Sequence, residues 1–200
     1  MKHVLWSVLG LAAVLSGNGL ASTGGNEAAA ILGFDAKTSR LYWAVYDHSE
    51  SGQFPQVMWL SLDSTEAGPH LYESVTQVGH DYKFWLEKSN RQLDSLRTRL
   101  KAPTSLSPKS IKLSRYARSR GYCSETNAYG RTTQTIWELR AIYGSYSGGA
   151  FVAAFCRDSL GVSWAGRIPQ QRWVIAIVTY PGIPYEGCYT RDQVMVLRRK

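Results

Sequence analysis

The chain has 200 residues, of which 44% are hydrophobic and 12% aromatic, and its 23 lysines and arginines against 15 aspartates and glutamates give a formal net charge of +8. Twelve tyrosines and seven tryptophans supply ample material for a core, so the chain does not need metal or many disulfides to fold. No segment after residue 15 is apolar for long enough to cross a bilayer, which excludes a membrane span in the rest of the chain.

The first residues have the order of a secretion signal. Lys2 and His3 give a short basic start, residues 4–15 form an apolar run too short for a bilayer, and Gly19 and Ala21 are the small residues that signal peptidase reads. We therefore expect a signal peptide over residues 1–21 and a single exported globular domain over residues 22–200. No cysteine follows the apolar run, which disfavours a lipid anchor. The mature protein is expected to be periplasmic or secreted.

Export determines how the three cysteines are interpreted. Cys123, Cys156 and Cys188 would lie in an oxidising compartment, where one disulfide forms and the third thiol is left over. Three pairings are possible, and the sequence does not choose among them. There is no C-x-x-C motif and no Cys/His pair at zinc spacing, so no metal site is predicted. The remaining cysteine is expected to be a small buried apolar side chain.

Two aromatic and β-branched stretches come next, at residues 41–47 and 54–62. They are separated by a polar, glycine-containing stretch, which predicts a β-hairpin. In the first strand both sets of alternate residues are apolar, so we expect it to be covered on both faces. These sets are Leu41, Trp43 and Val45 on one face and Tyr42, Ala44 and Tyr46 on the other.

The apolar period then changes to that of a helix. Within residues 81–103 the apolar positions recur at helical spacing and most charged residues lie elsewhere, which predicts a long amphipathic helix that ends at Pro103. Its apolar stripe is expected to lie against the sheet. The stripe consists of Tyr82, Trp85, Leu86, Leu93, Leu96 and Leu100.

Strand patterns return at residues 135–143, 149–156, 172–180 and 193–199. The stretches between them are rich in Gly, Pro, Ser and Asp, as turns are, and short connections favour antiparallel neighbours. The sequence therefore predicts an α+β fold, in which one long amphipathic helix packs on a mainly antiparallel β-sheet of six or more strands.

No catalytic motif is complete. Residues 144–148 spell Gly-Ser-Tyr-Ser-Gly, with tyrosine where a nucleophile elbow needs serine, and a hairpin turn explains these glycines. His48, His70 and His80 lie in polar or turn-like stretches, so surface roles are expected for them. We nominate no catalytic residue, no metal and no cofactor. An enzyme is not excluded, because many active sites leave no local signature.

One stretch carries the whole net charge. Residues 95–124 hold eight basic residues and no acid, while the rest of the chain holds 15 of each sign. Two structures fit residues 108–120. Ser107, Pro108 and Gly121 suit the start and stop of a helix, whereas residues 111–116 alternate like an exposed edge strand. The basic residues are Arg97, Arg99, Lys101, Lys109, Lys112, Arg115, Arg118 and Arg120.

Four functions fit this basic stretch: a solvated face, a dock for an acidic protein, a site for an anionic envelope component or polysaccharide, and a nucleic-acid site. Nucleic acid is the least favoured, because exported proteins seldom meet it. The leading hypothesis is an exported, non-enzymatic binding protein, such as an inhibitor or immunity-type protein, that captures an acidic partner. Its partner-binding residues would be Lys109, Lys112, Arg115, Tyr116, Arg118 and Arg120. The rival hypothesis is an exported hydrolase of an anionic polymer with a His-based site.

Overall fold

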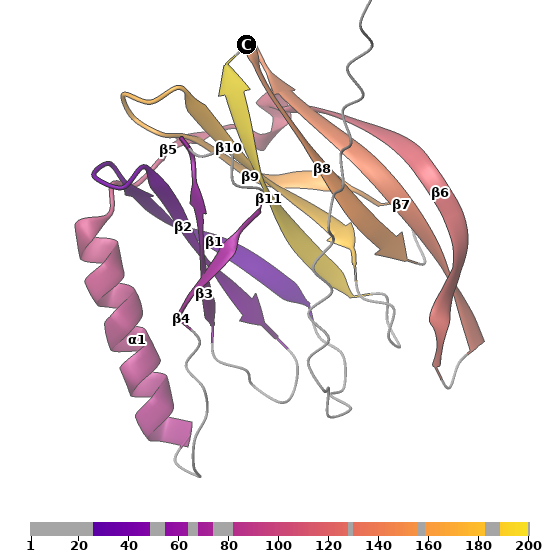
Figure 1. Ribbon diagram of the computed structural model, residues 1–200, viewed down its shortest axis with the longest axis horizontal. Helices are drawn as coiled ribbons and strands as arrows, with labels where there is room; N and C mark the ends of the chain where they lie inside the picture. The colour runs from indigo at the N-terminus through magenta and orange to yellow at the C-terminus, as the bar shows by residue number, and fades with distance from the viewer. Residues whose placement is uncertain are drawn as a thin grey trace, which may run out of the picture.

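The computed structural model describes residues 26–48, 55–63, 68–73, 82–127, 130–155, 159–182 and 189–199, which form eleven strands, one α-helix and one 3-10 helix (Figure 1). The N-terminal elements are β1 (Glu27–Asp35), β2 (Arg40–Asp47), β3 (Gln56–Ser61), β4 (His70–Glu73) and α1 (Tyr82–Arg99). They are followed by β5 (Thr104–Leu106), η1 (Pro108–Ser110), β6 (Lys112–Asn127), β7 (Gly130–Tyr143), β8 (Tyr146–Phe155), β9 (Gly161–Arg167), β10 (Trp173–Pro181) and β11 (Thr190–Arg199). The expected signal peptide lies outside the described residues.

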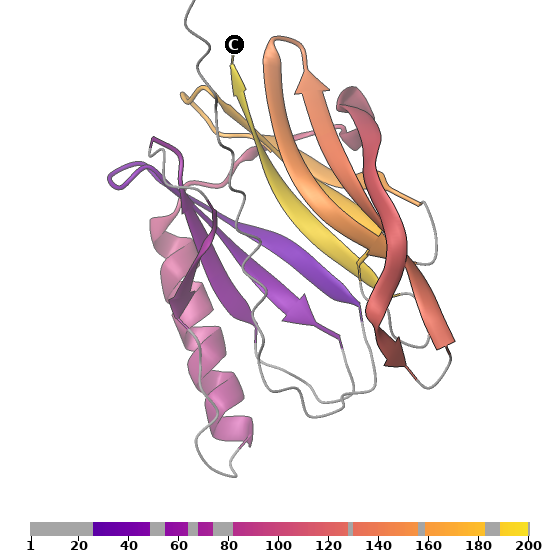
Figure 2. The same ribbon diagram turned by 45° about the vertical axis from the view of Figure 1, so that its right-hand side comes forward.

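The strands form two antiparallel sheets arranged in layers. One sheet has four strands in the order β1-β2-β3-β4, and the other has seven in the order β5-β9-β10-β11-β8-β7-β6. Figures 1 and 2 show α1 on one side of the four-stranded sheet and the seven-stranded sheet on its other side. The larger sheet curls, so that β6, β7 and β8 form the layer farthest from α1.

A separate apolar cluster fills the space between each pair of layers. Between α1 and the four-stranded sheet, Leu93 and Leu96 pack with Tyr42 and Ala44. The second cluster, between the two sheets, joins Leu41, Trp43, Phe34 and Leu62 to Ile168 and Ile175. The third lies inside the curl of the larger sheet and contains Trp137, Leu139, Ala141, Val152, Val174, Ala176, Val178, Met195 and Leu197. Strand β2 thus has both faces covered, as its sequence predicted.

The curl depends on a close approach of β8 to β11. These strands pair only through Arg198 with Ser147 and Arg199 with Tyr146. At the next residue, Gly148, an added Cβ would lie 2.4 Å from the Val196 carbonyl oxygen. Because glycine carries no side chain there, the backbone of β8 can cross over β11 and then diverge from it, which leaves room for the third cluster.

The predicted fold class is confirmed: the described chain is mainly antiparallel β with one helix packed on a sheet. The hairpin of β2 and β3 is confirmed, and so is the turn between β7 and β8, where Gly144 has φ 55°. Interpreting residues 157–171 as a linker was wrong, because β9 lies within them and pairs with β10. Its sequence, GVSWAGR, begins with glycine and is short, which hid the strand.

Residues 108–120 follow the edge-strand alternative after a single 3-10 turn, and the helix alternative is wrong from Lys112 onward. Pro108–Ser110 forms the 3-10 turn η1, which the Ser110 hydroxyl closes by donating to the Ser107 carbonyl oxygen at 2.6 Å. The chain then enters β6, the edge strand of the larger sheet, which pairs with β7. The helix therefore does not continue past one turn, and the basic residues from Lys112 onward lie on a strand.

Candidate binding surfaces

The basic residues of the 95–124 stretch do not form one surface. Arg97 and Arg99 lie in the last turn of α1, and Figures 1 and 2 show that helix on the opposite side of the molecule from β6. Arg97 also forms an ion pair with Asp94 at 3.4 Å. Lys101 follows the helix and forms a β-bridge with Phe34 of β1. The other basic residues lie on η1 and β6, and alternate positions of a strand point to opposite faces of the sheet.

Three of the predicted partner-binding residues lie on the outer face of β6, β7 and β8, which points away from the third cluster. The strand register brings Lys112 beside Ile142, Ser114 beside Arg140 and Tyr116 beside Glu138. Arg118 is on this face as well, because it forms an ion pair with Glu138. The cations of this outer face are therefore Lys112, Arg118 and Arg140, and Glu138 is its carboxylate among the described side chains.

Two exposed aromatic side chains stand on the outer face in a single row. Tyr116 lies directly across from Glu138, and Glu138 lies directly across from Phe151 on β8. Tyr116 is 54% exposed and Phe151 is 64% exposed, and the half-buried Ile136 lies in the next row. Large apolar side chains that are this exposed, and grouped on one sheet face, are characteristic of interaction surfaces.

The other predicted site residues lie on the inner side of the curl. Lys109 on η1 and Arg115 on β6 line a cleft of about 720 Å³ between β6 and the start of β9. The Arg115 guanidinium lies 5.0 Å from the centre of the Trp137 ring, at cation–π distance. A bulge after Ala117 shifts the register, and it places Arg120 beside the buried Thr135, which is also on the inner face.

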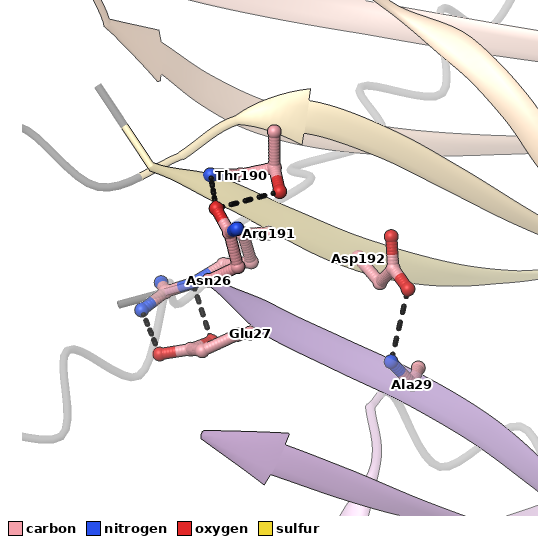
Figure 3. Close-up of polar contacts among 6 residues, drawn as sticks. All are labelled: Asn26, Glu27, Ala29, Thr190, Arg191 and Asp192. Atoms are coloured by element: carbon pink, nitrogen blue, oxygen red, sulfur yellow. Dashed lines mark hydrogen bonds and ion pairs between the residues drawn. The ribbon is translucent and has the colours of Figure 1, made fainter. Parts of the chain in front are cut away.

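A polar junction ties the start of β1 to β11 (Figure 3). Arg191 donates a hydrogen bond to Glu27 at 2.7 Å, and its Nε lies 2.7 Å from the second carboxylate oxygen. Asp192 accepts hydrogen bonds from the Ala29 backbone N–H at 2.9 Å and from the Thr179 hydroxyl at 2.5 Å. Asn26 accepts from the backbone N–H and the hydroxyl of Thr190.

Burial and charge perturb two groups of this junction. Burial alone would lower the pKa of Arg191, but the hydrogen bond and the charge of Glu27 outweigh it and raise the pKa above its ordinary value. Burial raises the pKa of Tyr180, and the charge of Arg191 opposes that shift without cancelling it. Tyr180 therefore stays a neutral hydroxyl, and it lines the cleft together with Thr179 and Thr190.

The described histidines do not gather at a catalytic centre. His48 follows β2 and donates its backbone N–H to the Asn26 carbonyl oxygen, and His70 on β4 stacks on the Trp59 ring with 4.4 Å between ring centres. Neither lines the cleft. His80, Cys156, Cys188 and the side chain of Cys123 lie outside the described residues, so the predicted disulfide remains a prediction. Among the residues that are described, no three His, Cys, Asp or Glu side chains are grouped as metal ligands.

Sequence reasoning missed Phe151, Arg140 and the β9 side of the cleft. Residues 149–155 are small or apolar at nearly every position, so period-two alternation could not tell which of them faces solvent. The register of β7 with β8 supplies that information, because it places Phe151 opposite Glu138 and not opposite the buried Leu139. A polar residue on the neighbouring strand was therefore the missing signal.

Comparison with known proteins does not assign this chain to a family. No protein-family model, no curated protein and no solved structure matches it. In the part of the chain that the structure describes, no helix is long and apolar enough to cross a membrane.

Proposed function

We propose that the protein is an exported, non-enzymatic binding protein that captures an acidic protein partner through the outer face of β6, β7 and β8. The observation that carries the proposal is the row of Tyr116 and Phe151 on a sheet face that also holds Lys112, Arg118 and Arg140. Aromatic residues and arginine are enriched in protein interfaces, and aromatic anchors commonly contribute most of the binding energy.

Charge on this face would speed capture of an acidic partner. Three cations and the single carboxylate of Glu138 give the described side chains of the outer face a net formal charge of +2. Complementary charge raises the association rate at low salt, while desolvated aromatic contacts slow dissociation. An inhibitor or a toxin-neutralising protein is the most concrete form of this function, and export is expected from the sequence of residues 1–21.

The test is capture of a partner by the mature protein from the exported fraction of its source cells. We expect the retained protein to be acidic and its association rate to fall as salt rises, because screening weakens exposed charges. Tyr116→Ala combined with Phe151→Ala should weaken the purified complex about 30-fold or more, since each anchor contributes on the order of 1–2 kcal/mol. Lys112→Glu should mainly slow association.

Lys109→Glu is the matched control, because it makes the same charge change three residues away on the inner side. It should leave the affinity for the partner nearly unchanged. Equal weakening by Lys109→Glu and Lys112→Glu would reduce the proposal to a general charge effect. An unchanged affinity for the double alanine variant, or retention of an envelope polysaccharide and no protein, would refute it.

A further inference from the structure

The cleft on the inner side of β6 has the composition of a small-molecule site. Its volume of about 720 Å³ falls within the range of roughly 300–1,000 Å³ that is typical of such sites. Ile111, Leu113, Leu160 and Val162 line it, and all four pack in or against the third apolar cluster. The wall is therefore apolar and continuous with the core, as in the mouths of β-barrels that bind organic ligands.

The charges of the cleft have a single sign. Lys109 and Arg115 are the charged residues in its lining, and no aspartate or glutamate is among the described lining residues. Two cations beside an apolar wall complement a molecule that has an apolar body and an anionic head. The Arg115 guanidinium stacks on the Trp137 ring at the edge of the cleft. Because this contact already restricts the side chain, Arg115 loses less conformational entropy when an anion binds.

Two of the remaining polar groups of the cleft can orient such a head. Ser159 and Tyr180 provide hydroxyl groups in the same lining, whereas the hydroxyls of Thr179 and Thr190 already donate to Asp192 and Asn26. A few polar groups in a mainly apolar pocket fix ligand orientation, while the apolar wall contributes most of the affinity.

We propose that this cleft binds a free amphipathic organic anion, with its carboxylate or sulfonate at Lys109 and Arg115 and its apolar body against Ile111, Leu113 and Val162. The site is separate from the proposed partner surface, because the two lie on opposite faces of β6.

The experiment uses the mature protein and two probes, anilinonaphthalene sulfonate for fluorescence and dodecanoate as a competitor below its micelle concentration. We expect saturable fluorescence enhancement that dodecanoate displaces, and displacement by dodecanol that is at least about tenfold weaker because dodecanol lacks the charge. Lys109→Gln combined with Arg115→Gln should weaken both probes about tenfold or more. Lys112→Gln is the matched control on the outer face and should leave both affinities unchanged.

Several results would overturn the inference. These are displacement by dodecanol as strong as by dodecanoate, wild-type affinity in the Lys109→Gln/Arg115→Gln variant, or equal loss in Lys112→Gln. Binding to vesicles of phosphatidylglycerol without saturable binding of free dodecanoate would place the ligand in a membrane and would also overturn it. A urea melt of the variant separates loss of the site from loss of the fold. Because Tyr116→Ala/Phe151→Ala should leave probe binding intact, failure here is distinguishable from failure of the proposed function.

Discussion

Glu27→Gln removes the carboxylate charge that holds Arg191 of β11 to the start of β1. The pair has one charge-assisted hydrogen bond of 2.7 Å from a terminal guanidinium nitrogen and a second N–O distance of 2.7 Å at Nε, which is not aligned as a hydrogen bond. The side chains are 26% and 44% exposed, so solvent screens part of the attraction. Exposed ion pairs contribute about 0–1 kcal/mol, and breaking a buried pair costs about 3–5 kcal/mol. This half-exposed pair should lie between them, and we expect a loss of about 1–2 kcal/mol in the free energy of unfolding.

Urea unfolding of the protein at neutral pH measures this loss as a shift in the midpoint. Thermal unfolding should show a melting temperature lower by roughly 2–8 °C, since a chain of this size shifts about 2–4 °C per kcal/mol. The difference should shrink in high salt. The raised pKa of Arg191 means that its contribution is fully present below the ordinary pKa of arginine, so titration of Arg191 adds no pH dependence in the neutral or acidic range.

Asp94→Asn is the matched control, because it removes a carboxylate from an exposed pair with Arg97 at 3.4 Å on α1. That change should cost at most about 0.5 kcal/mol. The reasoning is refuted if Glu27→Gln costs no more than Asp94→Asn. It is also refuted if Glu27→Gln and Arg191→Met show no coupling in a double-mutant cycle, since the cycle isolates the pair from the other effects of each substitution.

Two further variants test local features of the fold. Gly148→Ala should lower the free energy of unfolding in urea by about 1–3 kcal/mol, because its Cβ would lie 2.4 Å from the Val196 carbonyl oxygen. Gly149→Ala is the control and should cost little, because its Cβ would lie 3.4 Å from the nearest atom. Equal losses in the two variants would contradict the close crossing of β8 and β11. Asp35→Asn should destabilise at neutral pH. Burial raises the pKa of Asp35, but hydrogen bonds from Lys37 and Thr38 outweigh this effect and lower the pKa below its ordinary value. A carboxyl group whose pKa is lowered by folding stabilises the fold at pH values above its unfolded-state pKa, and this contribution is lost as the pH falls through its folded-state pKa. The stability difference between Asp35→Asn and wild type should therefore vanish in acid, and a difference that persists there would contradict this.

The sequence was most informative where a pattern had one local cause. Strand β2 was predicted with both faces covered, because apolar residues at every position leave no face for water, and Leu41 and Tyr42 do pack in different clusters. Helix α1 was predicted from its period, and Leu93 and Leu96 do lie against the four-stranded sheet. In both cases the sequence pattern predicts that a face is buried without indicating which element covers it.

The division into two sheets was not predictable in the same way. Apolar residues on both faces of β2 and β10 indicate two covering layers but do not say which elements supply them. Strand β1 has the sequence EAAAILGFD, and alanine is a weak strand former, so the edge strand that forms the polar junction with β11 was hidden. Its strand identity depends on pairing with β2 and on the Asp192 carboxylate that accepts the Ala29 N–H.

The number of charges in the basic stretch did not predict where those charges lie on the surface. The eight cations of this stretch follow one another in the sequence with no acid between them, but α1 carries Arg97 and Arg99 to the far side of the molecule. On β6 the pleat then separates the remainder between a face with exposed aromatics and a cleft with an apolar wall. The chemistry available to each cation is therefore set by its strand position.

The bulge in β6 changes which cations lie on each face, compared with strict alternation along the strand. Without it, Arg118 and Arg120, two residues apart, would share the outer face. The register shift between Ala117 and Ser119 leaves Arg118 with Glu138 and turns Arg120 to Thr135 on the inner face. A single inserted residue thus moves one exposed positive charge from the outer face of the sheet to its inner face. Bulges of this kind depend on pairing with a neighbouring strand, which is why neither the count nor the spacing of the charges could indicate it.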